Sequence, residues 1–178
     1  VPSDLVETFT FSSGQSLTLK VGDERRSYSI CAPVGRPPRI GVREVAGGAV
    51  SGWLVHKVQV GDVIDVRAPA GSFTPVLTVP GHHVLIAAGS GITPMLSIAG
   101  SILDADTTST VTLLYGNRRT DSVMFADDVA DLKDANPSRM RLMHVLSREP
   151  QEVDLFSGRL DAEKLRTLLA ATVEVATI

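Results

Sequence analysis

The sequence is poor in cysteine and in aromatic side chains. Cys31 is the only cysteine among 178 residues, so the chain can form no internal disulfide and can hold no cysteine-ligated iron–sulfur cluster by itself. A single cysteine is typical of a reducing compartment, and we expect a cytoplasmic protein. Aromatic residues make up only 4%, so an aliphatic core must hold the fold together.

Other absences exclude further classes of protein. No stretch reaches the roughly 18 consecutive apolar residues of a membrane-spanning helix, so we expect no membrane association. The net charge of −3 gives no basic footprint for nucleic acid. We expect no metal site, because the four histidines lack metal-ligand spacing, and no Ser–His–Asp or paired-carboxylate arrangement can be recognised. The histidines are His56, His82, His83 and His144.

The first part of the chain has the short alternating runs of β-strands. We predict strands at residues 17–21, 28–31, 40–45 and 63–67, and a short helix near 53–57. Short strands at this spacing favour a small antiparallel barrel. Glycines and prolines punctuate residues 69–81, so we place the end of this first domain at about residue 76.

The second part changes its period. Residues 84–88 form a continuous apolar run, as in a buried parallel strand, and residues 93–103 have helical spacing. We predict further strands at 111–115, 141–146 and 173–176, and helices at 123–132 and 161–170, the last capped by Asp161. This alternation predicts a parallel α/β domain over residues 82–178. The fold class is therefore a β domain followed by an α/β domain.

A glycine-rich turn joins the apolar run to the helix that follows it. Gly89 and Gly91 let the backbone approach a ligand, and the helix N-terminus at Ile92, Thr93 and Pro94 suits a phosphate. The turn predicts a nicotinamide dinucleotide site. The alternative is a tight strand-to-helix turn that binds nothing, because glycines are common there.

A second candidate site combines a cation, an aromatic ring and a hydroxyl at Arg26, Tyr28 and Ser29. An arginine can hold a pyrophosphate, and a tyrosine can cover a flavin ring. The alternative is an exposed arginine beside a core tyrosine. Gly48, Val50 and Ser51 lie at the glycine-rich start of a short helix that could bind the same pyrophosphate; the alternative there is a hairpin loop.

Cations follow two of the predicted parallel strands. Arg118 comes after the strand at 111–115, and Ser147 and Arg148 after the strand at 141–146. The end of the second strand of a dinucleotide fold meets the adenosine ribose, and arginine there favours the 2′-phosphate of NADP over NAD. The alternative is a solvated loop with Arg118 and Arg119 free.

In this order the motifs resemble the ferredoxin–NADP⁺ reductase superfamily over almost the whole chain. Arg26 to Ser29 are similar to its Arg-x-Tyr-Ser flavin motif, and Gly89 to Pro94 to its Gly-x-Gly-Ile-Thr-Pro nicotinamide motif. The details are most similar to reductase components of bacterial oxygenases, of the phenylacetyl-CoA epoxidase type. The resemblance implies catalytic roles for Tyr28, Ser29 and Thr93. It also places Val42 among the flavin-binding positions.

The resemblance implies FAD and NADP(H) as cofactors, and electron transfer from NADPH through FAD to an iron–sulfur carrier. The partners would be a ferredoxin domain or iron–sulfur protein and an oxygenase component. We expect three segments of the family to lie outside this chain: the first barrel strand, the Cys-Gly-Pro segment after Ile178, and the domain that holds the iron–sulfur cluster. Two alternatives stay open, a non-catalytic docking module that binds flavin or nucleotide, and a flavin reductase that releases reduced flavin.

Overall fold

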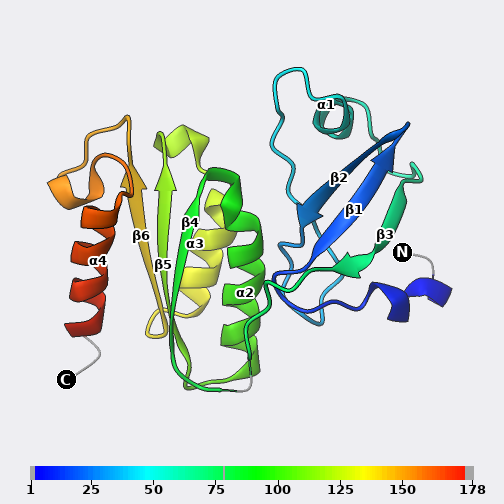
Figure 1. Ribbon diagram of the computed structural model, residues 1–178. Helices are drawn as coiled ribbons and strands as arrows, with labels where there is room; N and C mark the ends of the chain where they lie inside the picture. The colour runs from blue at the N-terminus through cyan, green and yellow to red at the C-terminus, as the bar shows by residue number, and fades with distance from the viewer. Residues whose placement is uncertain (1–2, 78, 175–178) are drawn as a thin grey trace. The chain divides into compact units, whose positions relative to one another are not determined.

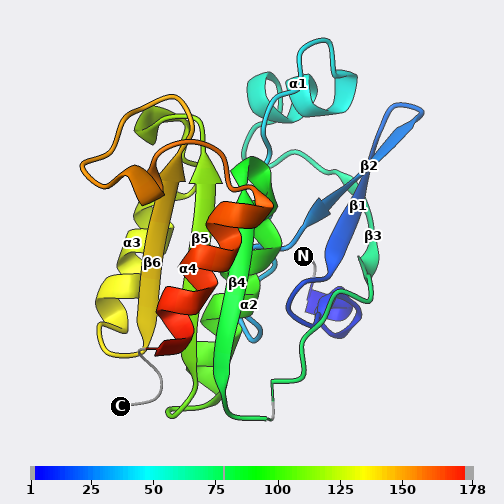
Figure 2. The same ribbon diagram turned by 60° about the vertical axis from the view of Figure 1, so that its left-hand side comes forward.

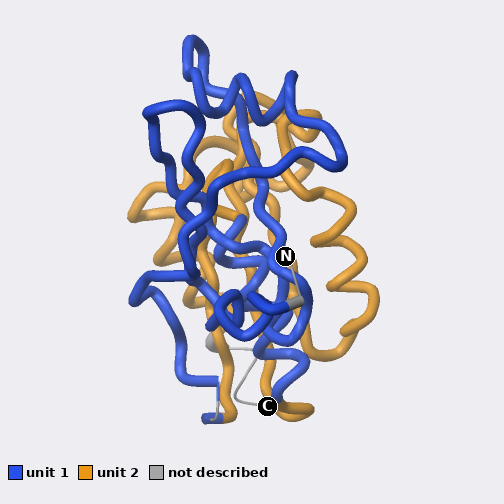
Figure 3. Tube along the Cα trace, turned by 90° about the vertical axis from the view of Figure 1, so that its right-hand side faces the viewer, with its two compact units in different colours: residues 1–79, 93–105 blue, residues 80–92, 106–178 orange. Residues whose placement is uncertain are grey.

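The computed structural model describes residues 3–77 and 79–174. It divides into two compact units (Figure 3): unit 1 comprises Val1–Val79 and Thr93–Ala105, and unit 2 comprises Pro80–Ile92 and Asp106–Ile178. The predicted domains, 1–76 and 82–178, follow the chain in order and stay a prediction. The compact units differ from them by grouping most of one helix, α2 (Ile92–Ala105), with the first segment of the chain.

Hydrogen bonds from small residues explain why this helix belongs to unit 1. The Ser97 hydroxyl donates to the Ala32 carbonyl at 2.7 Å, and the Val34 N–H donates to the Ser101 hydroxyl at 3.0 Å. Between these serines, Gly100 lies against Pro33, where an added Cβ would stand 2.7 Å from Pro33 Cγ. Only glycine permits this close approach of helix and loop.

Unit 1 contains a three-stranded antiparallel sheet in the order β2-β1-β3 (Figure 1). The strands are β1 (Ser16–Val21), β2 (Glu24–Ser29) and β3 (Asp65–Ala70), and the helix α1 (Ala49–His56) follows β2. Two short 3-10 turns, Ser3–Leu5 and Glu7–Phe9, precede the sheet. Leu17 and Leu19 of β1 are buried, and Leu54 of α1 packs against the cluster that contains them. This inner face of the sheet therefore looks toward α1.

The predicted barrel is an open sheet over the described residues. The predicted strand at 40–45 is wrong: it reduces to one isolated bridge between Ile30 and Ile40. A strand needs a neighbour to accept its hydrogen bonds, and prolines at 33, 37 and 38 remove donors from the segment that leads into it. The strands predicted at 17–21 and 63–67 correspond to β1 and β3 with shifted ends. Only the first two residues of the strand predicted at 28–31 belong to a strand, since β2 begins at Glu24 and ends at Ser29.

Unit 2 contains a parallel sheet in the order β4-β5-β6. The strands are β4 (His82–Ala88), β5 (Thr110–Asn117) and β6 (Met140–Leu146), and the helices are α3 (Ala126–Ala135) and α4 (Ala162–Glu174). Figures 1 and 2 show α3 and α4 on opposite faces of this sheet. The parallel α/β fold predicted from the alternating pattern is confirmed. Its consequence for function is that the carboxyl ends of all three strands meet at one edge.

The last predicted strand is wrong where the structure describes it. Val173 and Glu174 belong to α4, and residues 175 and 176 lie outside the described residues. The predicted N-cap of this helix is confirmed, since the Lys164 N–H donates to Asp161 Oδ1 at 2.9 Å. Ala170 and Ala171 favour the helix, so it continues past the point where the β-branched residues begin. Among the described helices, none combines the length and apolar character that crossing a bilayer requires.

Candidate functional site

Arg26 and Tyr28 lie on the inner face of β2. In the antiparallel register Arg26 faces Leu19, and Tyr28 faces Leu17, so both share the face that looks toward α1. Tyr28 is half-buried and packs against the core cluster, and this burial raises the pKa of its hydroxyl while Arg26 opposes the shift. Ser29 is half-buried next along the strand and pairs with Ser16.

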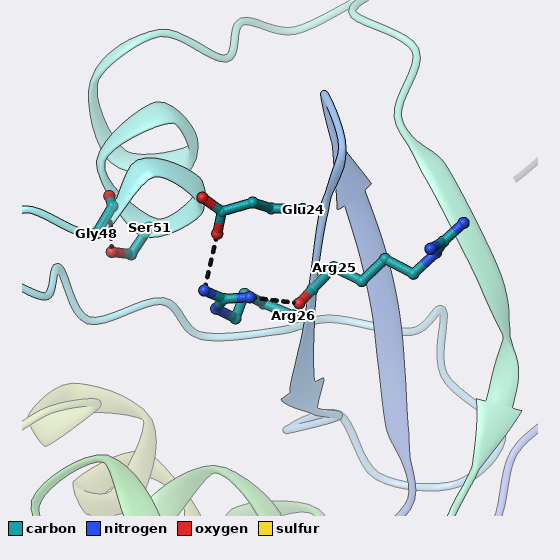
Figure 4. A network of polar contacts seen from close by, with 5 residues as sticks. All are labelled: Glu24, Arg25, Arg26, Gly48 and Ser51. Atoms are coloured by element: carbon teal, nitrogen blue, oxygen red, sulfur yellow. Dashed lines mark hydrogen bonds and ion pairs between the residues drawn. The ribbon is translucent and has the colours of Figure 1, made fainter.

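The Arg26 guanidinium is held by an acidic neighbour that the sequence motifs did not include. Its Nη2 lies 2.7 Å from Glu24 Oε2, and its Nη1 donates to the Arg25 carbonyl at 2.8 Å. Figure 4 shows Arg26 and Glu24 directed toward the start of α1, where Gly48 and Ser51 lie, while Arg25 extends the other way. The Arg26 side chain is 59% exposed. It is therefore open to an anion that could replace Glu24.

The start of α1 is built around Gly48 and Ser51. Gly48 is the N-cap, and an added Cβ there would stand 2.6 Å from Ser51 Oγ. Ser51 Oγ donates to the Gly48 carbonyl at 3.3 Å and accepts from the Val45 N–H at 3.1 Å. The helix N-terminus and Arg26 together suit a pyrophosphate, because the unpaired N–H groups and the guanidinium are both donors.

Three of the predicted flavin-binding residues are buried or half-buried, so their side chains also support the fold. Ser51 is 6% exposed and Val50 is 2% exposed, so the Val50 side chain belongs to the core, and Ser51 braces the loop before α1. Val42 is half-buried in the irregular segment between β2 and α1. Their contact with a flavin stays a prediction.

On unit 2, the predicted dinucleotide turn lies at the carboxyl end of β4. Gly89–Gly91 form a 3-10 turn, with Gly89 at a φ of +52°, the left-handed region that favours glycine. An added Cβ at Gly91 would meet no atom within 4 Å, so the backbone is open to a ligand on that side. Ile92 is fully buried, and Thr93 and Pro94 follow it in the first turn of α2, with Thr93 6% exposed.

The ends of β5 and β6 bring the two predicted cations together. The Ser147 N–H donates to the Asn117 carbonyl at 2.9 Å, and the Arg148 N–H donates to the Arg118 carbonyl at 2.8 Å. These bonds continue the parallel ladder by two residues beyond the strands. Arg118 and Arg148, both exposed, are therefore neighbours at the edge that also carries the glycine turn.

A carboxylate that the sequence motifs also did not include braces this edge. Glu149 accepts the Thr120 N–H at 2.9 Å and the Thr120 hydroxyl at 2.6 Å. These two hydrogen bonds lower the pKa of Glu149, and Arg119 adds to the effect. The contact joins the loop after β6 to the segment after β5, across 29 residues of sequence. No local pattern predicts it, because only the parallel pairing brings the two segments together.

Two polar side chains, those of Tyr115 and His144, pack against each other near the carboxyl ends of β5 and β6. Tyr115 is fully buried, and its ring lies 5.7 Å from that of His144, tilted by 40°. Burial lowers the pKa of His144, so its imidazole is neutral at pH 7. Within the described ranges, no group of three or more His, Cys, Asp or Glu side chains is placed to hold a metal ion.

Comparison with known proteins identifies the second half of the chain. Residues 85–177 match the model of the oxidoreductase NAD-binding domain family. The chain is 41% identical to one component of the 1,2-phenylacetyl-CoA epoxidase of Escherichia coli, over 97% of this chain and 51% of that protein. It is also 41% identical to the ferredoxin reductase component of the Mycobacterium tuberculosis 3-ketosteroid-9-alpha-monooxygenase, over 76% of this chain and 39% of that protein.

Solved structures show the same fold. An Amycolatopsis cytochrome P450 reductase superposes with a TM-score of 0.71 at 30% identity, covering 80% of this chain and 45% of the reductase. The flavohem-like FAD/NAD-binding domain of the Vibrio cholerae nitric oxide dioxygenase superposes with a TM-score of 0.73 at 26% identity, covering 93% of this chain and 80% of that domain. The chain spans about half the length, or less, of the curated relatives that it matches.

Proposed function

The chain belongs to the oxidoreductase NAD-binding domain family over residues 85–177, and we propose that it is part of a flavoprotein reductase that passes electrons from NADPH through FAD to an iron–sulfur carrier of an oxygenase system. One observation carries this proposal. The glycine turn at Gly89–Gly91 and the adjacent Arg118 and Arg148 lie at the same edge of one parallel sheet. Ligands of open α/β sheets bind at this carboxyl edge.

For NADPH, the glycine turn and the start of α2 would take the pyrophosphate and place the nicotinamide beside Thr93. Arg118 and Arg148 would hold the 2′-phosphate. A guanidinium meets a phosphate through two parallel hydrogen bonds, which fixes both position and orientation. The open space in front of Gly91 supports this arrangement.

For FAD, Arg26 and the N-terminus of α1 would hold the pyrophosphate. Tyr28 would lie against the flavin ring, and Ser29 would donate a hydrogen bond to it. The half-buried ring of Tyr28 supports this placement, because one part is fixed by the core while another stays exposed. Hydride transfer and its division into single electrons are chemistry that the two cofactors supply; the protein contributes binding and orientation.

The proposed partners supply the iron–sulfur centre, which a chain with one cysteine cannot ligate by itself. Cys31 is a buried free thiol, so the iron–sulfur centre that accepts electrons must come from another domain or another protein. The two curated relatives are named as components of an epoxidase and a monooxygenase. We propose an oxygenase component as the final partner, and a cytoplasmic location in keeping with the free thiol.

The test is an absorption spectrum of the full-length protein, followed by anaerobic addition of NADPH. We expect flavin bands that NADPH bleaches, together with iron–sulfur absorption. Loss of the bound flavin to solution on reduction would indicate a flavin reductase instead. A protein that binds no flavin and oxidises no NADPH with ferricyanide as the acceptor would contradict the proposal and favour a docking module.

A further inference from the structure

The hydroxyl of Tyr115 joins three segments of unit 2. Tyr115 is fully buried in the central strand β5, beside Ala87 of β4 in the parallel register. Its hydroxyl lies 3.0 Å from the Gly89 carbonyl oxygen and 3.1 Å from the Met124 carbonyl oxygen. A phenol has one hydrogen, so the two carbonyls share a single donor. The contact ties the glycine turn to the segment that leads into α3.

Packing alone does not require a hydroxyl at this position. Leu113 and Leu114 precede Tyr115 on β5, Gly116 follows it, and its ring packs against His144. A phenylalanine would fill nearly the same volume. Burying a hydroxyl costs free energy unless it finds partners, and here both partners are backbone carbonyls at the ends of neighbouring segments. The hydroxyl therefore acts on backbone geometry.

The geometry that it controls is the peptide between Gly89 and Ser90. The Gly89 carbonyl also accepts the Ile92 N–H, so two donors hold it toward the interior. The peptide is trans, so its N–H points opposite to its carbonyl. The Ser90 N–H is thereby directed away from the Tyr115 hydroxyl. Gly89, at a φ of +52°, has no side chain, so its own conformational preference does little to fix the orientation of this peptide.

We propose that Tyr115 is a positioning residue for dinucleotide binding, which holds the Gly89–Ser90 peptide in the orientation that a pyrophosphate needs. The inference rests on the proposed function and adds to it. Tyr115 touches no ligand; it acts through the Gly89 carbonyl. Tyr115 lies in β5, which ends at Asn117, one residue before Arg118, so the same strand supports both the glycine turn and the arginine proposed to bind the 2′-phosphate.

The experiment compares Tyr115→Phe with Thr112→Val in the full-length flavoprotein. Thr112 is equally buried on β5, and its hydroxyl contacts His82 Nε2 at 3.3 Å near the other end of the strand. Each variant loses one buried hydroxyl without losing much volume. Tyr115→Phe should fold, because Gly89 keeps its bond from Ile92. Two probes are titrated by calorimetry: NADP⁺, which spans the turn, and adenosine 2′-monophosphate, which reaches only the arginines.

We expect Tyr115→Phe to weaken NADP⁺ about three- to tenfold, the effect of one lost hydrogen bond, and to leave adenosine 2′-monophosphate within about twofold. The KM for NADPH should rise with the same ratio. Thr112→Val should change neither affinity. Unchanged NADP⁺ binding in Tyr115→Phe would overturn the inference, and so would equal weakening of both probes. A wild-type protein that binds neither probe would instead overturn the proposed function.

Discussion

The arginines of the two units stand on strands of opposite character. β2, which carries Arg26, is exposed from Glu24 to Ser27, and an ion pair with Glu24 positions the Arg26 guanidinium. β5, which leads to Arg118, is buried at every position except Thr110 and Gly116. The backbone of Arg118 is further fixed by its bond from Arg148. The Arg26 guanidinium is thus positioned by an exposed ion pair, whereas the backbone of Arg118 is positioned by a buried strand.

This contrast indicates which changes should disturb each of the two proposed binding sites. Exposed ion pairs contribute little and are easily replaced by a stronger anion. A backbone fixed by a packed parallel strand does not rearrange without disturbing the core. We therefore expect the proposed flavin side to respond to single charge changes, and the proposed dinucleotide side to respond to changes in backbone support.

The largest effect is expected at Arg26. Arg26→Ala should weaken FAD binding about ten- to a hundredfold, because a charge-assisted contact to pyrophosphate is worth about 1.5–3 kcal/mol. Arg25→Ala is the matched control, since Arg25 extends away from α1 in Figure 4 and should leave FAD affinity near the wild-type value. Flavin occupancy after dilution measures both. Equal loss in the two variants would show that net charge, not position, attracts the flavin.

The next effect concerns the choice between NADPH and NADH. Wild-type kcat/KM should favour NADPH by about tenfold or more, because one guanidinium contact to the 2′-phosphate is worth at least about 1.4 kcal/mol. Arg118→Ala should raise the KM for NADPH and leave that for NADH nearly unchanged. Equal use of both coenzymes by the wild type would contradict the assignment. An unchanged ratio in the variant would move the contact to Arg148 or Arg119.

A smaller effect, of opposite sign, is expected at Glu24. Glu24 must leave Arg26 when pyrophosphate arrives, so Glu24→Gln should tighten FAD binding about two- to fivefold, the range of an exposed ion pair. Damage to the fold cannot produce a gain in affinity, which makes the direction informative. The gain should shrink at high salt, because screening weakens the competing pair. Weaker FAD binding in this variant would mean that Glu24 supports the site.

The smallest effect is the pH dependence of stability from His144. Burial lowers the pKa of His144 in the folded state. As the pH falls past the ordinary histidine pKa of about 6.5, the unfolded chain therefore binds a proton at this residue more readily than the folded chain does. The free energy of unfolding should therefore fall as the pH drops from 7 to 5. His144→Gln should flatten this slope in urea titrations, and the slope that remains includes His82, whose pKa is also lowered. An unchanged slope would rule out His144 as its source.

Local sequence signals predicted the parallel half of the fold more closely than the antiparallel half. The apolar run at 84–88 and the helical spacing at 93–103 correspond to β4 and α2, because the period of each run is a local feature. The burial expected of that run is wrong, since β4 lies at the edge of the sheet and only Ala87 is buried in it. The strand predicted at 40–45 lacks a partner and reduces to the bridge at Ile40. Strand pairing depends on distant residues, which a local pattern does not include.

The same division applies to the candidate site. Sequence order alone specifies the motifs, because a glycine turn after an apolar run and arginines after the following strands are local features. Folding supplies their support: the Glu24–Arg26 pair, the Thr120–Glu149 contact and the hydroxyl of Tyr115 against Gly89. The last two join residues more than 25 positions apart, so they exist only once parallel pairing has aligned the strand ends. Glu24 and Arg26 are close in sequence, but only the folded chain directs their ion pair toward the start of α1, where we propose that the pyrophosphate binds.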